Sequence, residues 1–537
     1  MRVLDQIFIA GSACLILTSV GWTQAEPSRN EALAALAAIE LDRSRPGVLS
    51  FDSTRYEAGS VILSNVVIYN TGADEIERDA KGQPLDDNPY LGADLHIEEL
   101  RLDGPRLSSD DSLLLDGLVM TGFALLGHES SAVLSLESIR VDAPSPDLAA
   151  VIGEALRAPS VGGDDAQFEG DEVSAREVVF SGFVMEGVDA EGTDVRMRIE
   201  DTRLTYDADA AASGFVLRDW RVDTETAESG ALAFNVAEIR LDGIGIDTIG
   251  GWGEFIDQDD QAGFIEAYFQ TLMLQPGELY QVLNIRDVSL STSGVELALD
   301  ALTVNNQVNG ALTRSRTRLN GLSLVPDAEN EEGATVAAGL AQMGYDQITL
   351  QAEFNTNYDA ETGRVWTEGE NFYRLEDGFR LDVASDTSGY DQLSQVMAVA
   401  AEADRDDEAV AQAIGQDALS AIRINELALT LTDESLLSRF FTRMSEEQQM
   451  PVADARSQMA GAAGLMALGM TQSLGPDLGM QVNRALTRFI QEGGSLTVRV
   501  APDGTPTVMD MLTPDAKSGG LNVAAMGLSV THTPPSD

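Results

Sequence analysis

The chain has 537 residues, and 88 acidic against 34 basic residues give it a formal net charge of −54. A surface with this charge repels nucleic acid and anionic lipid headgroups, so we expect neither as an electrostatic partner. The single cysteine, Cys14, lies in a segment that we expect to be removed. Disulfides, thiol nucleophiles and thiolate metal sites are therefore excluded from the mature protein.

The first 25 residues have the pattern of an export signal. Arg2 gives a basic start, residues 7–22 form an apolar run, and residues 23–25 (TQA) suit cleavage before Glu26. The apolar run of 16 residues is shorter than the ~20 residues that a membrane-spanning helix needs. The sequence therefore predicts a signal peptide over 1–25 and a periplasmic protein, with an uncleaved inner-membrane anchor as the alternative.

Residues 26–386 are predicted to form a repeated-strand antiparallel β region with interspersed helices. From about residue 48 to 325, short segments rich in β-branched and apolar residues alternate with turn residues. Five segments (IEELRLDG, LESIRVDA, IEDTRLTY, LRDWRVDT and VAEIRLDG) resemble one another and place an arginine at the same point. We expect these arginines on the solvent face, in cross-strand ion pairs that contribute about 0.2–1 kcal/mol each. They are Arg101, Arg140, Arg203, Arg221 and Arg240.

The repeated strands share an irregularity in their apolar pattern. In residues 195–206, the apolar side chains before Glu200 and after Thr202 have opposite parity, which in a regular strand would place them on opposite faces. One inserted residue around Glu200–Thr202 restores a single apolar face, as a β-bulge does. Repeated bulges coil a sheet strongly, so we predict a long, coiled antiparallel sheet.

Helices are predicted within and after this region. Segment 145–156 begins with Ser145 and Pro146, a typical helix start, and 252–274 has apolar residues at helical spacing. A three-strand meander is predicted over 347–385. Residues 387–537 are predicted to be a helix-rich C-terminal region with a few closing strands, and the fold class is α+β with helices packed on one side of the sheet. The helices of that region are predicted at 390–422, 434–447, 452–473 and 477–492, and its strands at 422–433, 492–500 and 521–533.

The sequence contains no local catalytic or metal-binding pattern. His96, His128 and His532 are far apart, and no phosphate-binding loop, dinucleotide fingerprint or HExxH motif occurs. The acidic stretch 163–172 lacks the spacing of an EF-hand. We therefore predict a protein that is not an enzyme, with no catalytic residues, no metal ligands and no cofactor. A hydrolase would need two convergent carboxylates in a cleft, at least one with a raised pKa.

An apolar constellation in the C-terminal region is the candidate ligand-binding site. Residues 434–444 carry an apolar stripe at helical spacing, and the next helix carries methionines among Gly and Ala in MAGAAGLMALGM. Small residues let helices approach closely, and methionine packs adaptably against mobile partners. The pattern fits either a packed helical hairpin that covers one end of the sheet, or an apolar lid for an acyl chain or a partner helix. The lid candidates are Leu436, Leu437, Phe440, Phe441, Met444, Met459, Met466 and Met470.

Several segments together resemble a known group of proteins. Strands reading VILSNVVI, IEELRLDG and LNIRDVSL are followed by MGYDQITLQAEFNTNYDAETG (343–363), by DESLLSRFFTRMSEEQQMPVADARSQM (433–459) and by FIQEGGSLTVRV (489–500). In this style the chain resembles uncharacterised proteobacterial envelope proteins of the YdgA-like type. More distantly it is similar to AsmA-like proteins, and that resemblance implies a lipid-conducting groove made of repeated strands.

Two functions are compatible with these features. The first is a non-enzymatic, exported envelope protein that binds or shields lipid or another apolar ligand along a β-groove. The second is a structural or interaction protein of the envelope with a filled core, whose acidic exterior is salt-adapted or binds Ca²⁺ or another envelope protein. They differ in whether the inner face of the sheet is closed by protein or left as an apolar groove larger than the ~300–600 Å² patch of an ordinary monomer. The sequence does not fix the oligomeric state.

Overall fold

The computed structural model describes most of the chain in a series of ranges. These are 27–69, 94–126, 133–157, 174–188, 194–207, 212–226, 230–245, 271, 274–402, 408–469, 474–513 and 523–535. The predicted signal peptide, the acidic stretch 163–172, His128 and nearly all of the helix predicted over 252–274 lie outside these ranges.

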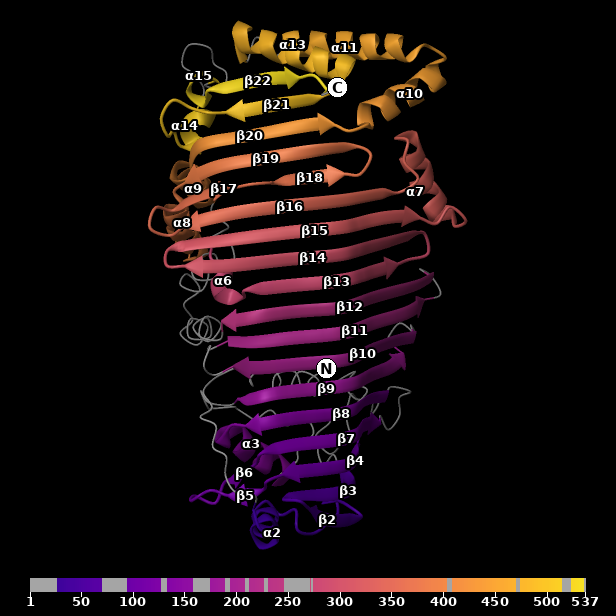
Figure 1. Ribbon diagram of the computed structural model, residues 1–537, viewed down its shortest axis with the longest axis vertical. Coiled ribbons are helices and arrows are strands. Elements are labelled where there is room, and N and C mark those ends of the chain that lie inside the picture. The colour runs from indigo at the N-terminus through magenta and orange to yellow at the C-terminus, as the bar shows by residue number, and fades with distance from the viewer. Residues whose placement is uncertain are drawn as a thin grey trace. The chain divides into compact units, whose positions relative to one another are not determined.

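Most of the described strands belong to a large antiparallel sheet of about 20 strands, which confirms the predicted fold class (Figure 1). Residues 106–107 and 113–114 form a separate two-stranded sheet. The chain divides into two compact units. Unit 1 comprises Met1–Gly250 with Ile285–Thr292, and unit 2 comprises Gly251–Asn284 with Ser293–Asp537. No helix in the described ranges is long and apolar enough to cross a membrane.

Unit 1 is a β-meander with two short helices on its apolar face. Strands β3, β4, β7, β8, β9, β10, β11 and β12 pair antiparallel in that order. Its elements are α2 (Arg29–Ala38), β1 (Leu49–Ser50), β2 (Ser53–Glu57), β3 (Ser60–Ile68), β4 (Asp94–Asp103), β5 (Arg106–Leu107), β6 (Leu113–Leu114), β7 (Gly117–Leu126), β8 (Val133–Pro144), α3 (Pro146–Arg157), β9 (Ala175–Val188), β10 (Asp194–Asp207), β11 (Ala212–Thr226), β12 (Gly230–Gly245) and most of β13 (Val282–Ser291).

The core of unit 1 is closed by α2 and α3. Leu36 of α2 and Leu148 of α3 belong to the same buried cluster as Leu63, Leu100 and Leu134 of the strands. The predicted start of α3 is confirmed, because the Ser145 hydroxyl accepts a hydrogen bond from the Leu148 backbone N–H at 3.2 Å, in the manner of a helix N-cap. This end of the sheet therefore has a filled core.

The repeated arginines of unit 1 all form ion pairs, as predicted, but not all across strands. Arg140 and Arg203 both reach Glu177 of β9, which lies on a neighbouring strand. The others pair with an aspartate two residues away on their own strand, as Arg101 does with Asp103 at 2.6 Å. The same-strand pairs of the repeat are Arg101–Asp103, Arg221–Asp219 and Arg240–Asp242. Such pairs fix side-chain direction along a strand more than they hold neighbouring strands together.

The predicted bulge at Glu200 takes a different form from the one expected. The ladder of β10 is interrupted at Glu200, yet its register against β9 and β11 is the same on both sides of the gap. The register survives because each partner carries its own irregular residue opposite Glu200: Gly182 of β9 (φ +63°) and Asp219 of β11 (φ +49°). Because all three strands are irregular at the same level, their side chains change faces together. The apolar side chains before and after this level therefore lie on one face of the sheet.

The same arrangement recurs on other strand pairs. A Cβ on Gly122 of β7 (φ +62°) would lie 2.3 Å from Cγ of Glu98, and one on Gly182 would lie 2.4 Å from Cγ of Glu137. In unit 2, a Cβ on Gly321 of β15 (φ +64°) would lie 2.1 Å from Oδ2 of Asp300. We call these positions the glycine–acid line, because a left-handed glycine lies beneath an acidic side chain of the neighbouring strand in each pair.

Unit 2 continues with long strands and ends in helices. Strand β16 pairs with β15 on one side, and with β17 and β18 on the other. Strands β19, β20, β21 and β22 follow in order. Its elements are α6 (Pro276–Leu279), β14 (Val295–Asn309), β15 (Leu312–Pro326), α7 (Glu331–Gln342), β16 (Ile348–Asp359), β17 (Arg364–Thr367), β18 (Phe372–Leu375), β19 (Phe379–Ser388), α8 (Tyr390–Glu402), α9 (Glu408–Ala421), β20 (Arg423–Asp433), α10 (Leu436–Gln448), α11 (Val452–Gly469), α13 (Pro476–Glu492), β21 (Ser495–Val500), α14 (Val508–Leu512), α15 (Val523–Met526) and β22 (Leu528–Thr533).

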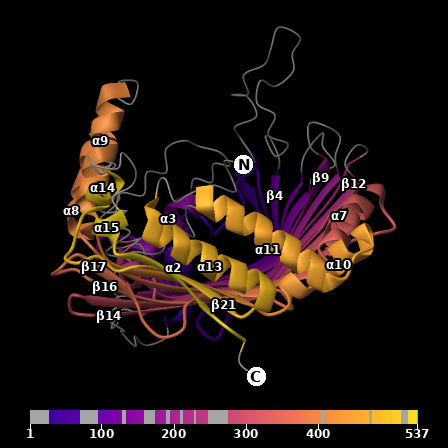
Figure 2. The same ribbon diagram turned by 90° about the horizontal axis from the view of Figure 1, so that it is seen from above.

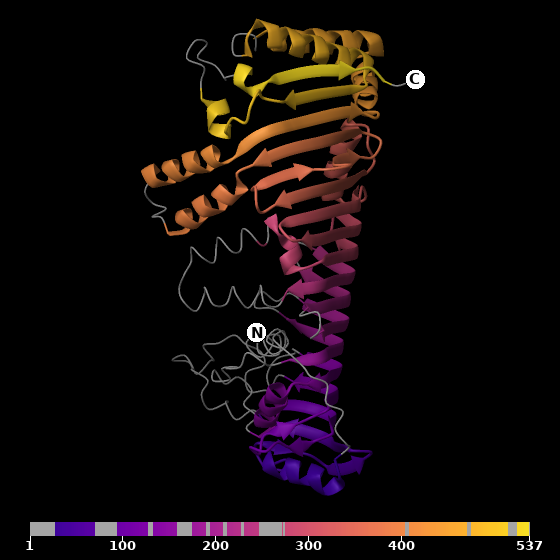
Figure 3. The same cartoon turned by 60° about the vertical axis from the view of Figure 1, so that its left-hand side comes forward.

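Two predicted elements of unit 2 are divided. The middle strand of the predicted meander is two short strands, β17 and β18, because residues 368–371 leave the ladder between them. The helix predicted over 390–422 is two helices, α8 and α9, which lie side by side at one end of the strands (Figure 3).

Candidate functional site

The sheet of unit 2 has one apolar face. Directly opposite residues in neighbouring antiparallel strands place their side chains on the same face. A cross-strand row of this kind runs from β14 to β22, and we call it the apolar row. It consists of Leu302, Leu319, Ala352, Tyr373, Leu381, Leu431, Leu496 and His532. The next row on the same face is Val383, Leu429, Val498 and Val530.

Much of this face is incompletely covered. Tyr373 is 50% exposed, Leu429 is 47% exposed and Val498 is 37% exposed. Among the twelve largest fully buried side chains of the described residues, only Phe441 and Met511 belong to unit 2. The apolar face of unit 2 thus differs from the buried core of unit 1, because several of its large side chains meet solvent.

The predicted lid residues lie on α10 and α11, beside the last strands (Figures 1 and 2). Four of them form the core between α10, α11 and α13: Phe441 is 1% exposed, and Leu437, Met444 and Met459 pack around it. The small residues Ala455, Ala460 and Ala463 of α11 complete this cluster, which allows the close helix approach that the sequence indicated.

The remaining lid residues lie outside that core. Phe440 is 42% exposed and meets the ring of Phe441 edge to face, with the ring centroids 5.2 Å apart. Met466 is 63% exposed, beside Leu465 at 72%. Leu436, the first residue of α10, is half-buried, and Met470 lies outside the described ranges. The structure thus divides the candidates into a packed set and a set that reaches solvent.

The opposite face of the same strands is polar and charged. Glu353 of β16 accepts hydrogen bonds from Arg316 Nη2 at 2.6 Å and from Arg318 Nε at 3.1 Å. Asn355 Nδ2 adds a longer bond of 3.3 Å to Glu353. Burial of Glu353 acts to raise its pKa, but the hydrogen bonds from Arg316, Arg318 and Asn355 outweigh it and lower the pKa to about 2. This carboxylate is therefore ionised throughout the physiological pH range.

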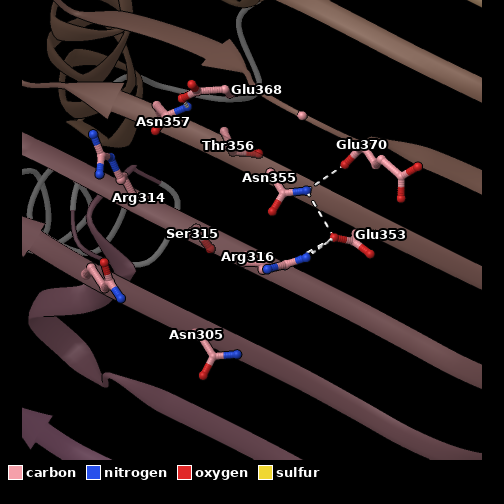
Figure 4. A pocket seen from close by; sticks show the side chains of 12 residues that line it. Asn305, Arg314, Ser315, Arg316, Glu353, Asn355, Thr356, Asn357, Glu368 and Glu370 are labelled. Atoms are coloured by element: carbon pink, nitrogen blue, oxygen red, sulfur yellow. Dashed lines mark hydrogen bonds and ion pairs between the residues drawn. The ribbon is translucent and has the colours of Figure 1, made fainter.

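An open hollow of about 680 Å³ lies on this charged face, between β14, β15, β16 and the segment that joins β17 to β18 (Figure 4). Asn355 closes one part of it by donating to the Glu370 carbonyl at 2.6 Å, and Asn357 Nδ2 approaches the Glu368 carboxylate at 3.4 Å. The lining residues are Asn305, Gln307, Arg314, Ser315, Arg316, Glu353, Asn355, Thr356, Asn357, Glu368, Gly369 and Glu370. Amides, guanidinium groups and carboxylates dominate this lining, so it is suited to hydrogen bonding.

The described residues offer little for covalent or metal chemistry. No group of three or more His, Cys, Asp or Glu side chains within them is arranged to hold a metal ion. His96 is exposed on β4, and His532 Nε2 lies 2.8 Å from the Gly493 carbonyl oxygen. In the described hollow the best placed carboxylate, Glu353, has a lowered pKa, whereas a general acid requires a raised one.

Sequence reasoning missed the charged cluster and the hollow. The available signal was the alternation TRSRTR at 313–318, which places three arginines on one face of a strand. Its meaning depends on Glu353 in the next strand, and that partner becomes visible only once the register is known.

Comparison with known proteins adds a partial match. A protein-family model described only as "Uncharacterized protein" matches residues 373–533. A search of curated proteins finds no match to the chain.

Proposed function

We propose that this chain is a non-enzymatic, exported envelope protein that holds the acyl chains of a lipid on the apolar face of unit 2. The observation that carries the proposal is the apolar row, which crosses the strands from β14 to β22 while its neighbourhood stays partly open to solvent. An acyl chain laid across such a row would gain about 0.8 kcal/mol for each buried CH₂ group. The resemblance to AsmA-like proteins agrees with this function.

The charge distribution favours contacts with the chain of a lipid over contacts with its headgroup. A net charge of −54 repels anionic headgroups, so binding must come from apolar contact. Among the lid residues that the structure describes, Phe440 and Met466 are the exposed ones, which leaves them free to contact a ligand. Phe441 and its neighbours would then hold α10 and α11 in place.

A structural or interaction role is the second candidate. The buried cluster beneath α2 and α3 in unit 1 supports it, because there the face is closed by protein. The two functions differ in what occupies the apolar face of unit 2: a lipid in the first, and no lipid in the second.

Native mass spectrometry of the protein purified from its own envelope fraction, combined with lipid extraction, distinguishes them. We expect phospholipid or fatty acid in fixed stoichiometry. Leu429→Glu introduces a charge on the apolar face and should abolish the bound lipid. Ala384→Glu introduces the same charge at an exposed position on the opposite face and should retain it.

Two results would count against lipid binding at this face. One is bare wild-type protein from a preparation in which a known lipid carrier keeps its cargo. The other is equal lipid content in folded Leu429→Glu and Ala384→Glu, because that lipid would have to lie elsewhere.

A further inference from the structure

The hollow on the charged face of unit 2 is a second candidate site, and its chemistry differs from that of the apolar row. Most of its lining residues alternate with those of the apolar face along β14, β15 and β16, so the two sites lie on opposite sides of the same strands. A ligand of the hollow would therefore contact other side chains than a lipid on the apolar row.

The floor of the hollow is built from two cross-strand rows of the same composition. Asn305 of β14, Arg316 of β15 and Asn355 of β16 lie opposite one another, and the next row is Gln307, Arg314 and Asn357. Each row thus places a guanidinium group between two amides. Amides both donate and accept hydrogen bonds, whereas a guanidinium only donates.

The two arginines differ in how they are engaged. Arg316 forms an ion pair with Glu353, with Nη2 2.6 Å from Oε1, whereas Arg314 forms no ion pair (Figure 4). Within the described strands only Arg314 and Arg423 lack one, although carboxylates outnumber arginines throughout this chain. Arg314 is exposed, so its donors face the open space of the hollow.

The balance of charge argues against an anionic ligand. Glu353, Glu368 and Glu370 line the hollow with only two arginines, so the lining is net negative in an already acidic protein. An anion beside Arg314 would meet the Glu368 carboxylate, and a cation beside Glu368 would meet Arg314. A neutral ligand rich in hydroxyl groups avoids both conflicts, because each hydroxyl can accept from Arg314 or an amide and donate to a carboxylate.

An aromatic side chain extends the second row. Trp366 of β17 lies directly opposite Asn357, so its indole is on the same face as Gln307 and Arg314. The Arg364 guanidinium lies over this indole, with Cζ 4.9 Å from the ring centroid, so a sugar ring would meet the remaining surface of the indole through its polarised C–H bonds. The volume of about 680 Å³ is within the ~300–1,000 Å³ of small-molecule sites.

We infer that the hollow is a binding site for a neutral saccharide, with Arg314, Gln307 and Asn357 hydrogen bonding to its hydroxyl groups and Trp366 beside the sugar ring.

Saturation-transfer difference NMR on the full chain tests this inference. The probes are neutral oligosaccharides of glucose, galactose, mannose and N-acetylglucosamine. We expect saturation transfer to at least one of them, and a loss of affinity of about 10- to 100-fold in Arg314→Ala, the range for a hydrogen bond from a charged group. Asn357→Ala should also lower the affinity for the same probe.

Arg423→Ala is the matched control, because Arg423 is the other exposed strand arginine without an ion pair and lies away from the hollow. It should bind the probe as the wild type does. The inference is overturned if no neutral saccharide receives saturation, or if Arg314→Ala and Arg423→Ala bind it equally. It is also overturned if inorganic phosphate, followed by phosphorus NMR, binds at Arg314 and the saccharides do not.

Discussion

The glycine–acid line predicts the cost of adding a single methyl group at Gly321. Gly321 in β15 has φ +64°, and Gly310 in the turn between β14 and β15 has φ +62°. Alanine at either position must adopt a left-handed backbone, which costs roughly 1–2 kcal/mol. The two positions differ in their surroundings: a Cβ at Gly321 would lie 2.1 Å from Oδ2 and 2.4 Å from Cγ of Asp300, whereas nothing lies within 4 Å of a Cβ at Gly310.

The displacement of Asp300 should add a further cost. Asp300 is exposed, so its side chain can turn aside at the cost of a displaced rotamer, about 0.5–1.5 kcal/mol. We therefore expect Gly310→Ala to lower the free energy of unfolding by about 1–2 kcal/mol, and Gly321→Ala to lower it by about 1.5–3.5 kcal/mol. Equilibrium urea unfolding followed by circular dichroism measures both changes.

A double mutant isolates the contact. Asp300→Ala removes Cγ and Oδ2 and leaves the Asp300 Cβ at 3.1 Å, a distance that small shifts can relieve. In that background Gly321→Ala should cost no more than Gly310→Ala, which gives a coupling energy of about 0.5–1.5 kcal/mol. The reasoning is refuted if Gly321→Ala costs only as much as Gly310→Ala in the wild-type background, or if its extra cost survives the removal of Asp300.

Three further predictions concern pH, packing and salt. The pKa of Glu353 is about 2 in the folded chain against 4.5 ordinarily, so its ionised form stabilises the fold by about 3 kcal/mol above pH 4.5. That contribution is lost as the pH falls from 4.5 to 2, so the stability gap between the wild type and Glu353→Gln should shrink over this range, and a constant gap would contradict the assignment. Phe441→Ala should lower the free energy of unfolding by about 3–5 kcal/mol, whereas Phe440→Ala, at a 42% exposed position, should cost much less; equal costs in urea unfolding would show that Phe441 is not the centre of the helical core. Because the net charge is −54, the melting temperature should rise as salt shortens the Debye length from about 30 Å at 0.01 M to about 3 Å at 1 M, and a flat calorimetric response would argue against charge repulsion.

Features that depend on neighbouring residues in the sequence were predictable. The strand periodicity, the start of α3 at Ser145–Pro146 and the close packing of α11 all follow from short segments. The ionic partners of Arg101 and Arg240 were also within reach, because Asp103 and Asp242 are two residues away.

Features that depend on register were not predictable. The hollow exists because Gln307, Arg314 and Asn357 lie opposite one another, although they come from three strands with no shared motif. The apolar stripe of α10 shows that one face is buried, but not that Phe441 is covered by α11 while Phe440 remains exposed. The parity change around Glu200 predicted a bulge, whereas its outcome depends on Gly182 in the partner strand.

The glycine–acid line connects the repeated sequence to the continuity of the apolar face. Leu297 and Leu302 of β14 have opposite parity and would lie on opposite faces of a regular strand. They lie opposite Leu324 and Leu319 of β15, which also differ in parity, because both strands change face between them, at Asp300 and Gly321. The register of this pair is unchanged, so Leu297, Leu302, Leu319 and Leu324 lie on a single face.

Strand β16 has no matching irregular residue, and there the register against β15 shifts between Leu319 and Leu322. The shift keeps Leu350 and Ala352 of β16, which have the same parity, on the face that Leu322 and Leu319 share. The matched irregularities of β14 and β15 and the register shift of β16 thus both keep the apolar side chains on one face of the sheet. Gly122 and Gly182 have the same role in unit 1, where α2 and α3 close the face, so the glycine–acid line keeps a face continuous whether protein or solvent covers it. In unit 2 that face is the one across which the proposed ligand would lie.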